Sequence, residues 1–332
     1  MAVSAPPGRT MYAIYDLGRA PVTYDAMNFL VVARLWASRR GFSGFHTIFV
    51  RAPNEGFRDQ TPKDRTLTVD EKVWRLSHIL MPMAAAARDC VGVSIVNDRR
   101  DLGVILKNLD AEQIFPPNYT VEEPFTVIFL AAVFRLSPTE SEMNTFQPSP
   151  AGLGKVDEWL AARVPGGRPV VITLRTSRVE PERNSRTAEW LAAARAIRDR
   201  GYPVLFVPDT ELVTGGCEDR EFEDFPVFAL GAMDLDLRLA MYRRALLNMA
   251  DNGGPSFLNF YMEDSKIVCF LPVDKLPIVV AAGGESRLAL LLGMELGGNF
   301  PYGSPVRRLV WRPDRAPAIL EEFDRSIAAL ES

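Results

Sequence analysis

The order of apolar and polar residues predicts alternating strands and helices along most of the chain. The clearest unit begins with an apolar, β-branched run at residues 169–174, which has the length of one strand buried on both faces. A polar loop follows, then helical periodicity at residues 187–200, a stop at Gly201, and a second apolar run at residues 204–207. This order predicts a βαβ unit. Because its crossover is right-handed, the loop after the first strand should lie where open α/β sheets bind ligands.

The N-terminal half shows the same alternation. The polar stretch at residues 51–70 is long for a loop inside a compact domain, so we expect it to be functional or mobile. The apolar run at residues 125–134 fits either a strand or the start of a buried helix. The predicted strands of this half are residues 11–15, 46–50 and 91–96, and the predicted helices are residues 26–38, 69–87 and 99–108.

A break in this alternation predicts the domain boundary. Residues 138–154, PTESEMNTFQPSPAGLG, are rich in Pro, Ser, Thr and Gly without periodicity and are the best linker candidate. We expect an N-terminal domain of residues 1–147 and a C-terminal domain of residues 148–332, which fits about 150 residues per domain. Beyond the βαβ unit, we expect helices at residues 155–163, 238–249 and 256–262, a strand at residues 266–271, a short apolar element at residues 276–281, and a strand followed by a helix at residues 306–332.

The shared βα order of the two halves predicts an α/β protein with two facing Rossmann-like domains and a cleft between them. With 47% hydrophobic and 24% charged residues, the composition is that of a globular protein. The net charge of −4 argues against nucleic acid as a partner. Cys90, Cys217 and Cys269 match no metal-ligand spacing and are odd in number, and the chain has only two histidines. A reduced, cytoplasmic protein without a histidine-based metal site is therefore expected.

The chain offers no clear membrane or export signal. No apolar run reaches the roughly 20 residues that a membrane span needs. The first residues do not combine a basic segment with an apolar core, so we do not expect a signal peptide. A peripheral contact with the inner membrane is also considered, although no basic amphipathic helix indicates one.

The loop after the predicted strand at residues 169–174 is rich in arginine. It contains three arginines within nine positions, next to an amide and a hydroxyl at the start of a helix. An ordinary solvated loop is the alternative, but solubility does not require such a cluster. We predict that this loop binds phosphate through Arg175, Arg178, Arg183, Asn184 and Ser185.

Two carboxylates follow the second strand of the same unit. Asp209 and Glu211 come directly after residues 204–207, where a carboxylate is well placed to accept hydrogen bonds from ribose hydroxyls. Capping of a helix by Asp209 or Thr210 is an equal alternative. Asp209 and Glu211 are therefore candidates for contacts with the ribose or sugar of a nucleotide ligand.

A glycine-rich turn supplies a second candidate for phosphate binding. Two consecutive glycines let backbone amides approach a ligand closely, and a helix start after them would add partial positive charge. A simple turn between two helices is the alternative. The turn lies in the same half as the arginine-rich loop, so both could line one site. Its residues are Asn252, Gly253, Gly254, Pro255 and Ser256.

The loop after the first predicted strand holds the candidate base. Asp25 stands immediately before the apolar helix at residues 26–38, and Asp16 ends the strand. A carboxylate in this loop could take the proton from an attacking hydroxyl. Asp25 could instead be only the N-cap of the helix. We predict that Asp25 is the general base.

With these residues, the chain resembles GT-B type glycosyltransferases, nearest in plan to the heptosyltransferase-like family. The turn Asn252 to Ser256 matches the family's short C-terminal motif, and Asp25 occupies the position of its N-terminal catalytic Asp. The sequence departs from the pattern at Asn252, where an acidic residue is usual, and at Phe257, where a His often follows. It also has Tyr24 ahead of Asp25 in place of the usual Gly. A distinct but related transferase family is therefore expected.

The resemblance implies an inverting transferase that moves a sugar from a nucleotide-sugar donor to a glycan, a lipid-linked saccharide or another hydroxyl acceptor. Arginines and backbone amides would neutralise the donor diphosphate, so we expect no metal and no other cofactor. The single Asp-x-Asp sequence, at Asp234 and Asp236, more readily starts a helix. One alternative is an epimerase or hydrolase of the nucleotide sugar with the same fold. Another is a non-catalytic protein that binds a nucleotide sugar or a polysaccharide-assembly partner, which the changes at Asn252 and Phe257 favour.

Overall fold

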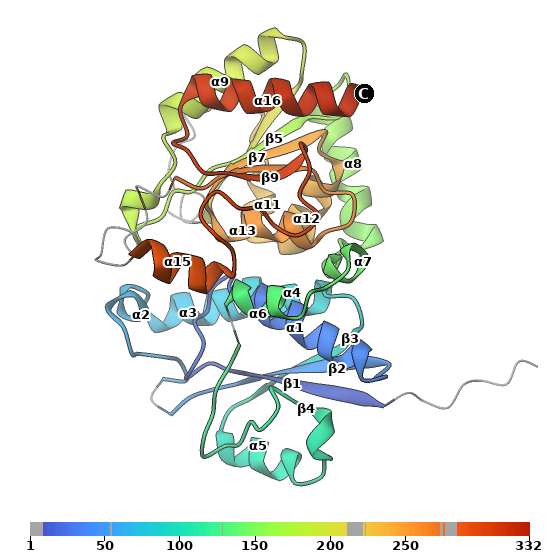
Figure 1. Cartoon of the computed structure of the whole chain (residues 1–332), viewed down its shortest axis with the longest axis vertical. Helices are drawn as coiled ribbons and strands as arrows, with labels where there is room; N and C mark the ends of the chain where they lie inside the picture. Colours follow the sequence, from blue (N-terminus) through green and yellow to red (C-terminus); the bar gives the residue numbers. More distant parts are fainter. Residues whose placement is uncertain are drawn as a thin grey trace, which may run out of the picture. The chain divides into compact units, whose positions relative to one another are not determined.

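The protein is α/β and divides into two compact units, Met1–Thr145 and Phe146–Ser332. The computed structural model describes residues 9–53, 55–127, 129–210, 222, 224–272, 275 and 284–332. Each unit contains a parallel sheet with helices on both faces (Figure 1). The expected α/β class is therefore confirmed for both halves. Residues 276–281, for which an apolar element was expected, lie outside the described residues.

Unit 1 is built on a four-stranded sheet with the order β3-β2-β1-β4. The strands β1 (Thr10–Asp16), β2 (Gly44–Val50), β3 (Cys90–Val96) and β4 (Ile114–Phe115) are all parallel to their neighbours. The apolar helix α1 (Ala26–Arg39) is buried along most of its length, as its sequence predicts. On the other face, α5 (Arg99–Leu106) inserts Leu102 into a cluster with Ile14 and Ile48 (Figure 1).

Short helices fill the long polar stretch and the segment after it. Thr61 and Thr68 each form a capping box, at the starts of α2 (Pro62–Thr66) and α3 (Val69–Arg75). The helix predicted at residues 69–87 is present as α3, a π-helical turn η1 (Leu76–Leu80) and α4 (Met81–Ala86). A 3-10 turn η2 (Ala111–Gln113), α6 (Leu130–Arg135) and α7 (Glu140–Met143) complete the unit, and the apolar run at residues 125–134 contains the start of α6.

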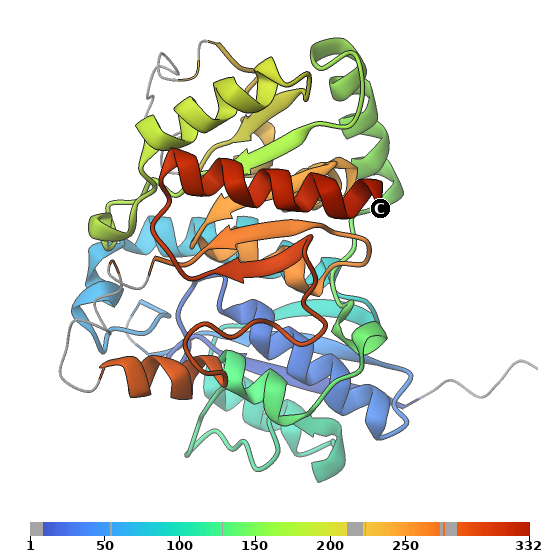
Figure 2. The same ribbon diagram turned by 45° about the horizontal axis from the view of Figure 1, so that its top comes forward.

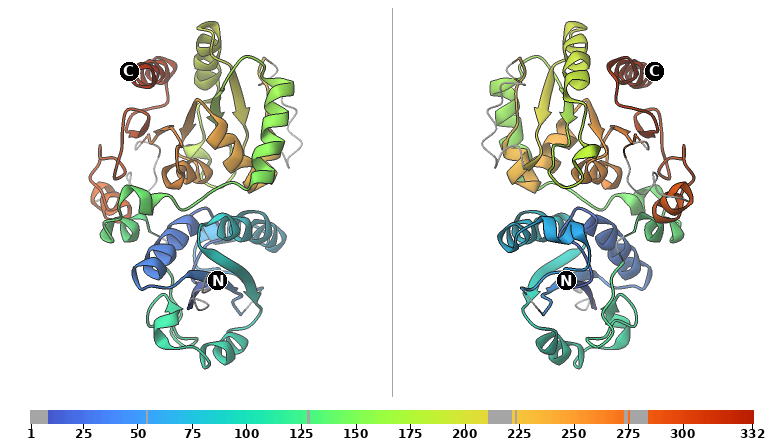
Figure 3. Two further views of the ribbon diagram at one scale, coloured as in Figure 1. Left: turned by 90° about the vertical axis from the view of Figure 1, so that its right-hand side faces the viewer. Right: turned by 90° about the vertical axis from the view of Figure 1, so that its left-hand side faces the viewer.

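Unit 2 contains a five-stranded parallel sheet with the order β6-β5-β7-β8-β9. Helices α9 (Thr187–Asp199) and α16 (Ala316–Glu331) lie side by side over one face, where Trp190 and Phe323 join the apolar core (Figure 2). Helices α8 (Pro150–Arg163) and α12 (Leu235–Arg244) pack together on the other face (Figure 3). The strands are β5 (Val170–Thr173), β6 (Val204–Val207), β7 (Leu247–Asp251), β8 (Ile267–Phe270) and β9 (Arg307–Val310).

The remaining elements of unit 2 are short. They are η3 (Pro181–Arg183), α11 (Leu230–Met233), α13 (Gly254–Phe257), η5 (Leu258–Tyr261) and α15 (Gly284–Leu292). Asp234 accepts hydrogen bonds from the first turn of α12, so the Asp-x-Asp sequence starts a helix as expected. The helix expected at residues 256–262 is present as the short α13 followed by a 3-10 turn.

One sequence prediction is wrong in unit 2. Residues 238–249 are not one helix, because α12 ends at Arg244, Ala245 is extended with ψ 143°, and β7 begins at Leu247. A buried helix and a buried strand joined by two residues give one continuous apolar run, so periodicity does not separate them. The linker expected at residues 138–154 contains the boundary between the two units, which lies between Thr145 and Phe146. The same segment also holds α7 and the start of α8, where Ser149 caps the helix and Pro150 opens it.

Candidate functional site

The two segments predicted to bind phosphate meet at one point of the unit 2 sheet. In the parallel order β6-β5-β7-β8-β9, β6 is added on one side of β5, and β7, β8 and β9 are added on the other side. The side on which strands are added therefore switches between β5 and β7. Loops at such a switch point diverge and leave room for a ligand at the carboxyl ends of the strands. Arg183 in the loop after β5 donates from Nη2 to the carbonyl oxygen of Asn252, just after β7, at 3.4 Å.

Arg175 holds the arginine-rich loop together. Its guanidinium donates to Oδ1 of Asn184 and to the carbonyl oxygens of Val179 and Glu180. Ser185 closes the loop, since its Oγ accepts from the Arg175 backbone N–H at 2.8 Å. Burial, followed by the charge of Arg183, lowers the pKa of Arg175 from its ordinary value. Three of the predicted ligand residues are thus engaged in shaping the loop, while Arg178 is exposed on its surface.

Buried polar atoms without hydrogen-bond partners gather at this switch point. Ten such side-chain atoms occur among the described residues, and four of them belong to the β5 and β7 loops or to the end of β7. Buried polar groups in folded proteins are nearly always hydrogen-bonded, so a local excess of exceptions needs an explanation. A polar ligand seated between the two loops would supply the missing partners. The four atoms are Thr176 Oγ1, Arg183 Nε, Asp251 Oδ2 and Ser256 Oγ.

A buried ionic cluster, missed by the sequence analysis, lies beside these loops. Asp251 ends β7, and Asp314 follows β9, and both side chains are completely buried. Lys275 lies between them, with Nζ 3.0 Å from Asp314 Oδ1 and 3.5 Å from Asp251 Oδ2. Its Nζ also donates to the carbonyl oxygen of Asn184 at 2.8 Å. The cluster therefore ties the arginine-rich loop to the carboxyl ends of β7 and β9.

The two carboxylates of this cluster have different electrostatic environments. Burial, and then the charge of Asp314, raise the pKa of Asp251 to about 6. Burial alone would also raise the pKa of Asp314, but hydrogen bonds from Arg186 and the charge of Lys275 outweigh it and lower that pKa. Asp314 also accepts from Trp190 Nε1 at 3.1 Å. Asp314 is thus a firmly held anion, whereas Asp251 changes its charge near neutral pH.

The carboxylate after β6 joins the same edge of the sheet. Asp209 Oδ2 accepts from the Thr176 backbone N–H at 3.3 Å, and its Oδ1 accepts from the Thr210 backbone N–H at 2.7 Å. This contact brings the β6 loop to the β5 loop. Glu211, the second predicted carboxylate, lies outside the described residues.

The glycine-rich turn is compact. The Gly253 backbone N–H bonds to the Asp251 carbonyl oxygen at 2.7 Å, and Ser256 N–H bonds to the Gly253 carbonyl oxygen at 3.1 Å. A Cβ added to Gly253 would lie 3.8 Å from Arg175 Cβ, so the turn runs directly past the arginine-rich loop. Pro255 is in the first turn of α13.

In unit 1, the two aspartates of the first loop differ in exposure. Asp16 is fully buried and receives a bidentate pair from Arg99, with the Tyr119 hydroxyl and the Gly18 backbone N–H completing its contacts. Asp25 is exposed at the start of α1, and its side chain makes no capping hydrogen bond to the helix. It accepts from Thr23 Oγ1 at 2.8 Å. The Asp16 carboxylate is therefore fully engaged in holding unit 1 together, whereas the exposed Asp25 carboxylate is open to solvent.

The described residues contain neither a candidate metal cluster nor a candidate membrane span. No group of three or more His, Cys, Asp and Glu side chains there is arranged to hold a metal ion. Within the same residues, no helix combines the length and apolarity that crossing a membrane would need.

Each of the two units is a parallel α/β unit, which is consistent with the GT-B-like fold expected from the sequence. The structure is similar to ADP-heptose LPS heptosyltransferase II of E. coli, with a TM-score of 0.57 and 12% sequence identity over 96% of this chain and 100% of that one. At this identity, the likeness is one of fold. It is also similar, at a TM-score of 0.47 and 13% identity, to a family 9 glycosyltransferase from Veillonella parvula DSM 2008, over 81% of this chain and 83% of that one. No protein-family model and no curated protein sequence matches the chain.

Proposed function

We propose that this protein is a glycosyltransferase that binds the diphosphate of a nucleotide-sugar donor at the β5/β7 switch point of unit 2. The observation that carries the proposal is the group of four buried polar atoms without hydrogen-bond partners at that point, next to Arg178 and Arg183. The Arg183 Nε–H and the hydroxyls of Thr176 and Ser256 can donate to an anionic ligand, whereas the carboxylate oxygen Asp251 Oδ2 can only accept, from a hydroxyl of the ligand. The switch point of a parallel sheet is also the place where nucleotides bind. The heptosyltransferase-like fold supports the same assignment.

In this proposal, cationic side chains and backbone amides carry the charge of the leaving diphosphate. Arg178 and Arg183 face it from the β5 loop, and the Gly254 amide faces it from the β7 turn, where Gly253, whose own amide donates to the Asp251 carbonyl oxygen, lets the backbone come close. Such preorganised donors stabilise a developing phosphate charge without a metal ion, so the reaction is metal-independent. Arg175, Asn184 and Ser185 position the loop, Ser256 and Asn252 line the turn, and Asp209 or Glu211 binds the ribose or sugar hydroxyls.

The transfer itself is a single displacement with inversion. Asp25 takes the proton of the acceptor hydroxyl while that oxygen forms a bond to the anomeric carbon of the donor. The bond between that carbon and the diphosphate oxygen breaks, and the nucleoside diphosphate leaves with the bonding electrons. The attack comes from the side opposite the leaving group, so the configuration inverts.

The similar E. coli protein is named for ADP-heptose and lipopolysaccharide, which makes ADP-sugars the first donors to test. The acceptor would be the hydroxyl of a glycan or of a lipid-linked saccharide. With such an acceptor, the protein would act in the cytoplasm and contact the inner membrane peripherally.

A thermal-shift screen against nucleoside diphosphates and nucleotide sugars, with and without EDTA, tests the donor site. A ligand at one hundred times its Kd stabilises the native state by about 2.7 kcal/mol, and the rise in Tm should survive EDTA. The rise should be lost in Arg183→Ala and kept in Arg195→Ala, where an exposed arginine is paired with the exposed Asp224. A failure of every nucleotide to stabilise the wild type would overturn the proposal.

Turnover assays separate the transferase from its alternatives. A transferase consumes the donor only when an acceptor is present. Consumption without any acceptor would instead indicate an epimerase or a hydrolase. A donor that binds and is never consumed would indicate a non-catalytic binding protein.

A further inference from the structure

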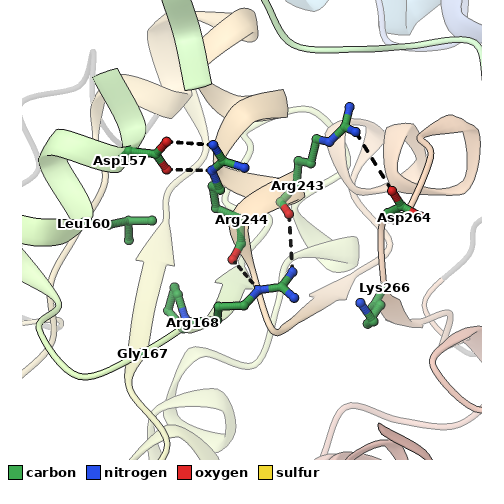
Figure 4. A pocket seen from close by; sticks show the side chains of 9 residues that line it. Asp157, Leu160, Gly167, Arg168, Arg243, Arg244, Asp264 and Lys266 are labelled. Atoms are coloured by element: carbon green, nitrogen blue, oxygen red, sulfur yellow. Dashed lines mark hydrogen bonds and ion pairs between the residues drawn. The ribbon is translucent and has the colours of Figure 1, made fainter. Parts of the chain in front are cut away.

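A cavity of about 560 Å³ lies at the amino end of the unit 2 sheet, opposite the switch point. It is bounded by α8, by the end of α12, and by the residues that lead into β5 and β8 (Figure 4). Its volume falls in the range of sites that hold small organic ligands, roughly 300–1,000 Å³. None of the residues proposed to bind the donor lines it.

The lining of this cavity is dominated by cations. Four of the lining residues are basic and two are acidic, which leaves a net charge of +2 (4 − 2). The basic residues are Arg168, Arg243, Arg244 and Lys266, and the acidic residues are Asp157 and Asp264. The residues come from four separate segments of the chain, so the fold has gathered the charges into one place.

Within the described residues, one of these cations is tightly neutralised by a carboxylate. Arg244 and Asp157 form a bidentate pair at 2.6 and 2.7 Å. Arg243 and Asp264 approach only to 3.9 Å. The Arg168 guanidinium instead binds the end of α12, where it donates to the carbonyl oxygens of Arg244 at 3.2 Å and Ala245 at 2.6 Å. These carbonyls carry partial negative charge, which offsets Arg168 in part.

Among the described residues, Lys266 is the least compensated cation of this cavity, since only the charge of Asp264 acts in its favour. Within the described part of the chain, its ammonium has no hydrogen-bond or ion-pair partner, and the side chain is half-buried. Figure 4 shows it pointing toward Arg168 across the cavity. Burial, and then the like charge of Arg168, lower the pKa of Lys266 from its ordinary value. Two like charges held beside a half-buried space favour an anion between them.

We propose that this cavity is a second ligand site, which binds a phosphate ester or diphosphate group carrying at least two negative charges. Lys266 and Arg168 would contact the anion directly, and Arg243 would turn to it from its long contact with Asp264. The flexible ammonium and the planar guanidinium groups both suit phosphate oxygens. The same group could belong to a dissolved ligand or to a lipid headgroup.

Calorimetric titration with inorganic pyrophosphate tests this site. Because pyrophosphate also suits the proposed donor site, the titration uses the full chain carrying Arg183→Ala, which disables that site. Pyrophosphate should bind this protein, and adding Lys266→Gln should weaken the binding about tenfold or more. Lys107→Gln, the same change at an exposed lysine of unit 1, should leave the binding unchanged. Arg243→Gln provides a second variant that should weaken the binding as Lys266→Gln does.

Vesicle sedimentation distinguishes the two sources of the anion. If the source is a membrane, vesicles of phosphatidylcholine with phosphatidic acid should bind the protein, and Lys266→Gln should abolish that binding. If the source is dissolved, pyrophosphate binds and the vesicles do not. The proposal is overturned if neither probe binds, or if both bind equally well to Lys266→Gln. Nucleotide stabilisation of the otherwise wild-type protein should survive Lys266→Gln, so failure here leaves the proposed donor site unaffected.

Discussion

Lys275 Nζ lies 3.0 Å from Asp314 Oδ1, and the side chain of Asp314 is fully buried. The same ammonium lies 3.5 Å from Asp251 Oδ2 and donates to the Asn184 carbonyl oxygen. This cation therefore lies against two buried carboxylates, of which Asp314 is also paired with Arg186, and fastens the arginine-rich loop to the sheet. The stability of unit 2 and the shape of its candidate ligand site depend on the same side chain.

Replacing Lys275 with Met should destabilise unit 2 strongly. Removal of one partner from a buried ion pair leaves an uncompensated charge and costs about 3–5 kcal/mol. Urea denaturation at pH 7.5 measures this loss. Lys155→Met, at an exposed position of α8, is the control and should change the free energy of unfolding by no more than about 0.5 kcal/mol. Equal stabilities of the two variants would show that the buried cluster does not need its cation.

Asp251→Asn should change how stability depends on pH. The pKa of Asp251 is raised to about 6 in the folded protein, mainly by burial, so the native state binds this proton more tightly than the unfolded state. The wild type therefore loses stability as pH rises from about 4 to about 6, and the loss persists above that pH. A shift of about 2 units corresponds to about 3 kcal/mol.

The measurement compares the variant with the wild type at pH 4 and at pH 7.5. The amide introduced by Asp251→Asn cannot ionise, so the stability of the variant relative to the wild type should increase between these values. Constant effects of the substitution on local contacts cancel in this comparison. A difference that is independent of pH would mean that Asp251 titrates at its ordinary pKa.

Replacing Arg175 and replacing Arg183 should have different effects on stability and on ligand binding, although both residues lie in one loop. Arg175 donates to three acceptors within the loop, so Arg175→Ala should lower the Tm of the ligand-free protein. Arg183 makes one ion pair with Glu180 and a long contact at 3.4 Å to the Asn252 carbonyl oxygen. Arg183→Ala should therefore change the ligand-free Tm less, and weaken nucleoside diphosphate binding about tenfold or more. The reverse order of effects would assign the phosphate contact to Arg175.

Much of the scaffold around the candidate site can be predicted from sequence. The β-branched run before Arg175 and the stop at Gly201 identify β5, α9 and β6 because each element carries a strong local signal. The rule that ligands bind at carboxyl ends of parallel strands then points to the loop after β5. The structure adds that this loop and the turn at Asn252 touch each other.

The buried cluster could not be predicted in the same way. Asp251, Lys275 and Asp314 are single residues far apart in the sequence, and only the pairing of β7, β8 and β9 brings them together. The sequence does not reveal β7, because the apolar run of α12 continues into the strand without a break in periodicity. The position of Asp251 at the end of a strand could therefore not be recognised. Recognition of that strand would have placed Asp251 at its carboxyl end, where a functional carboxylate is expected.

Two Gly→Ala variants should have opposite effects on stability. A Cβ on Gly18 would lie 2.6 Å from Arg99 Nη2 and 2.8 Å from Ala52 Cβ, so Gly18→Ala should disturb the Arg99–Asp16 pair and cost about 1–3 kcal/mol. Gly154 lies within α8, and a Cβ added there would meet no atom within 4 Å, so Gly154→Ala should stabilise the helix by about 1 kcal/mol. Thermal unfolding of both variants measures the effects. A destabilised Gly154→Ala protein would contradict the second expectation.

Asp25→Asn should abolish sugar transfer and leave donor binding intact. The exposed carboxylate makes no capping bond to α1, so its loss should cost the helix little. Loss of a general base lowers the rate by about 10²–10⁴-fold, because the acceptor hydroxyl then keeps its proton as the new bond forms. Donor consumption in the presence of acceptor measures the rate, and thermal shift with the donor measures binding. Asp101→Asn, at an exposed carboxylate in α5, is the matched control and should remain fully active. Full activity of Asp25→Asn would remove Asp25 from the mechanism, whereas loss of both binding and turnover would make it a donor contact.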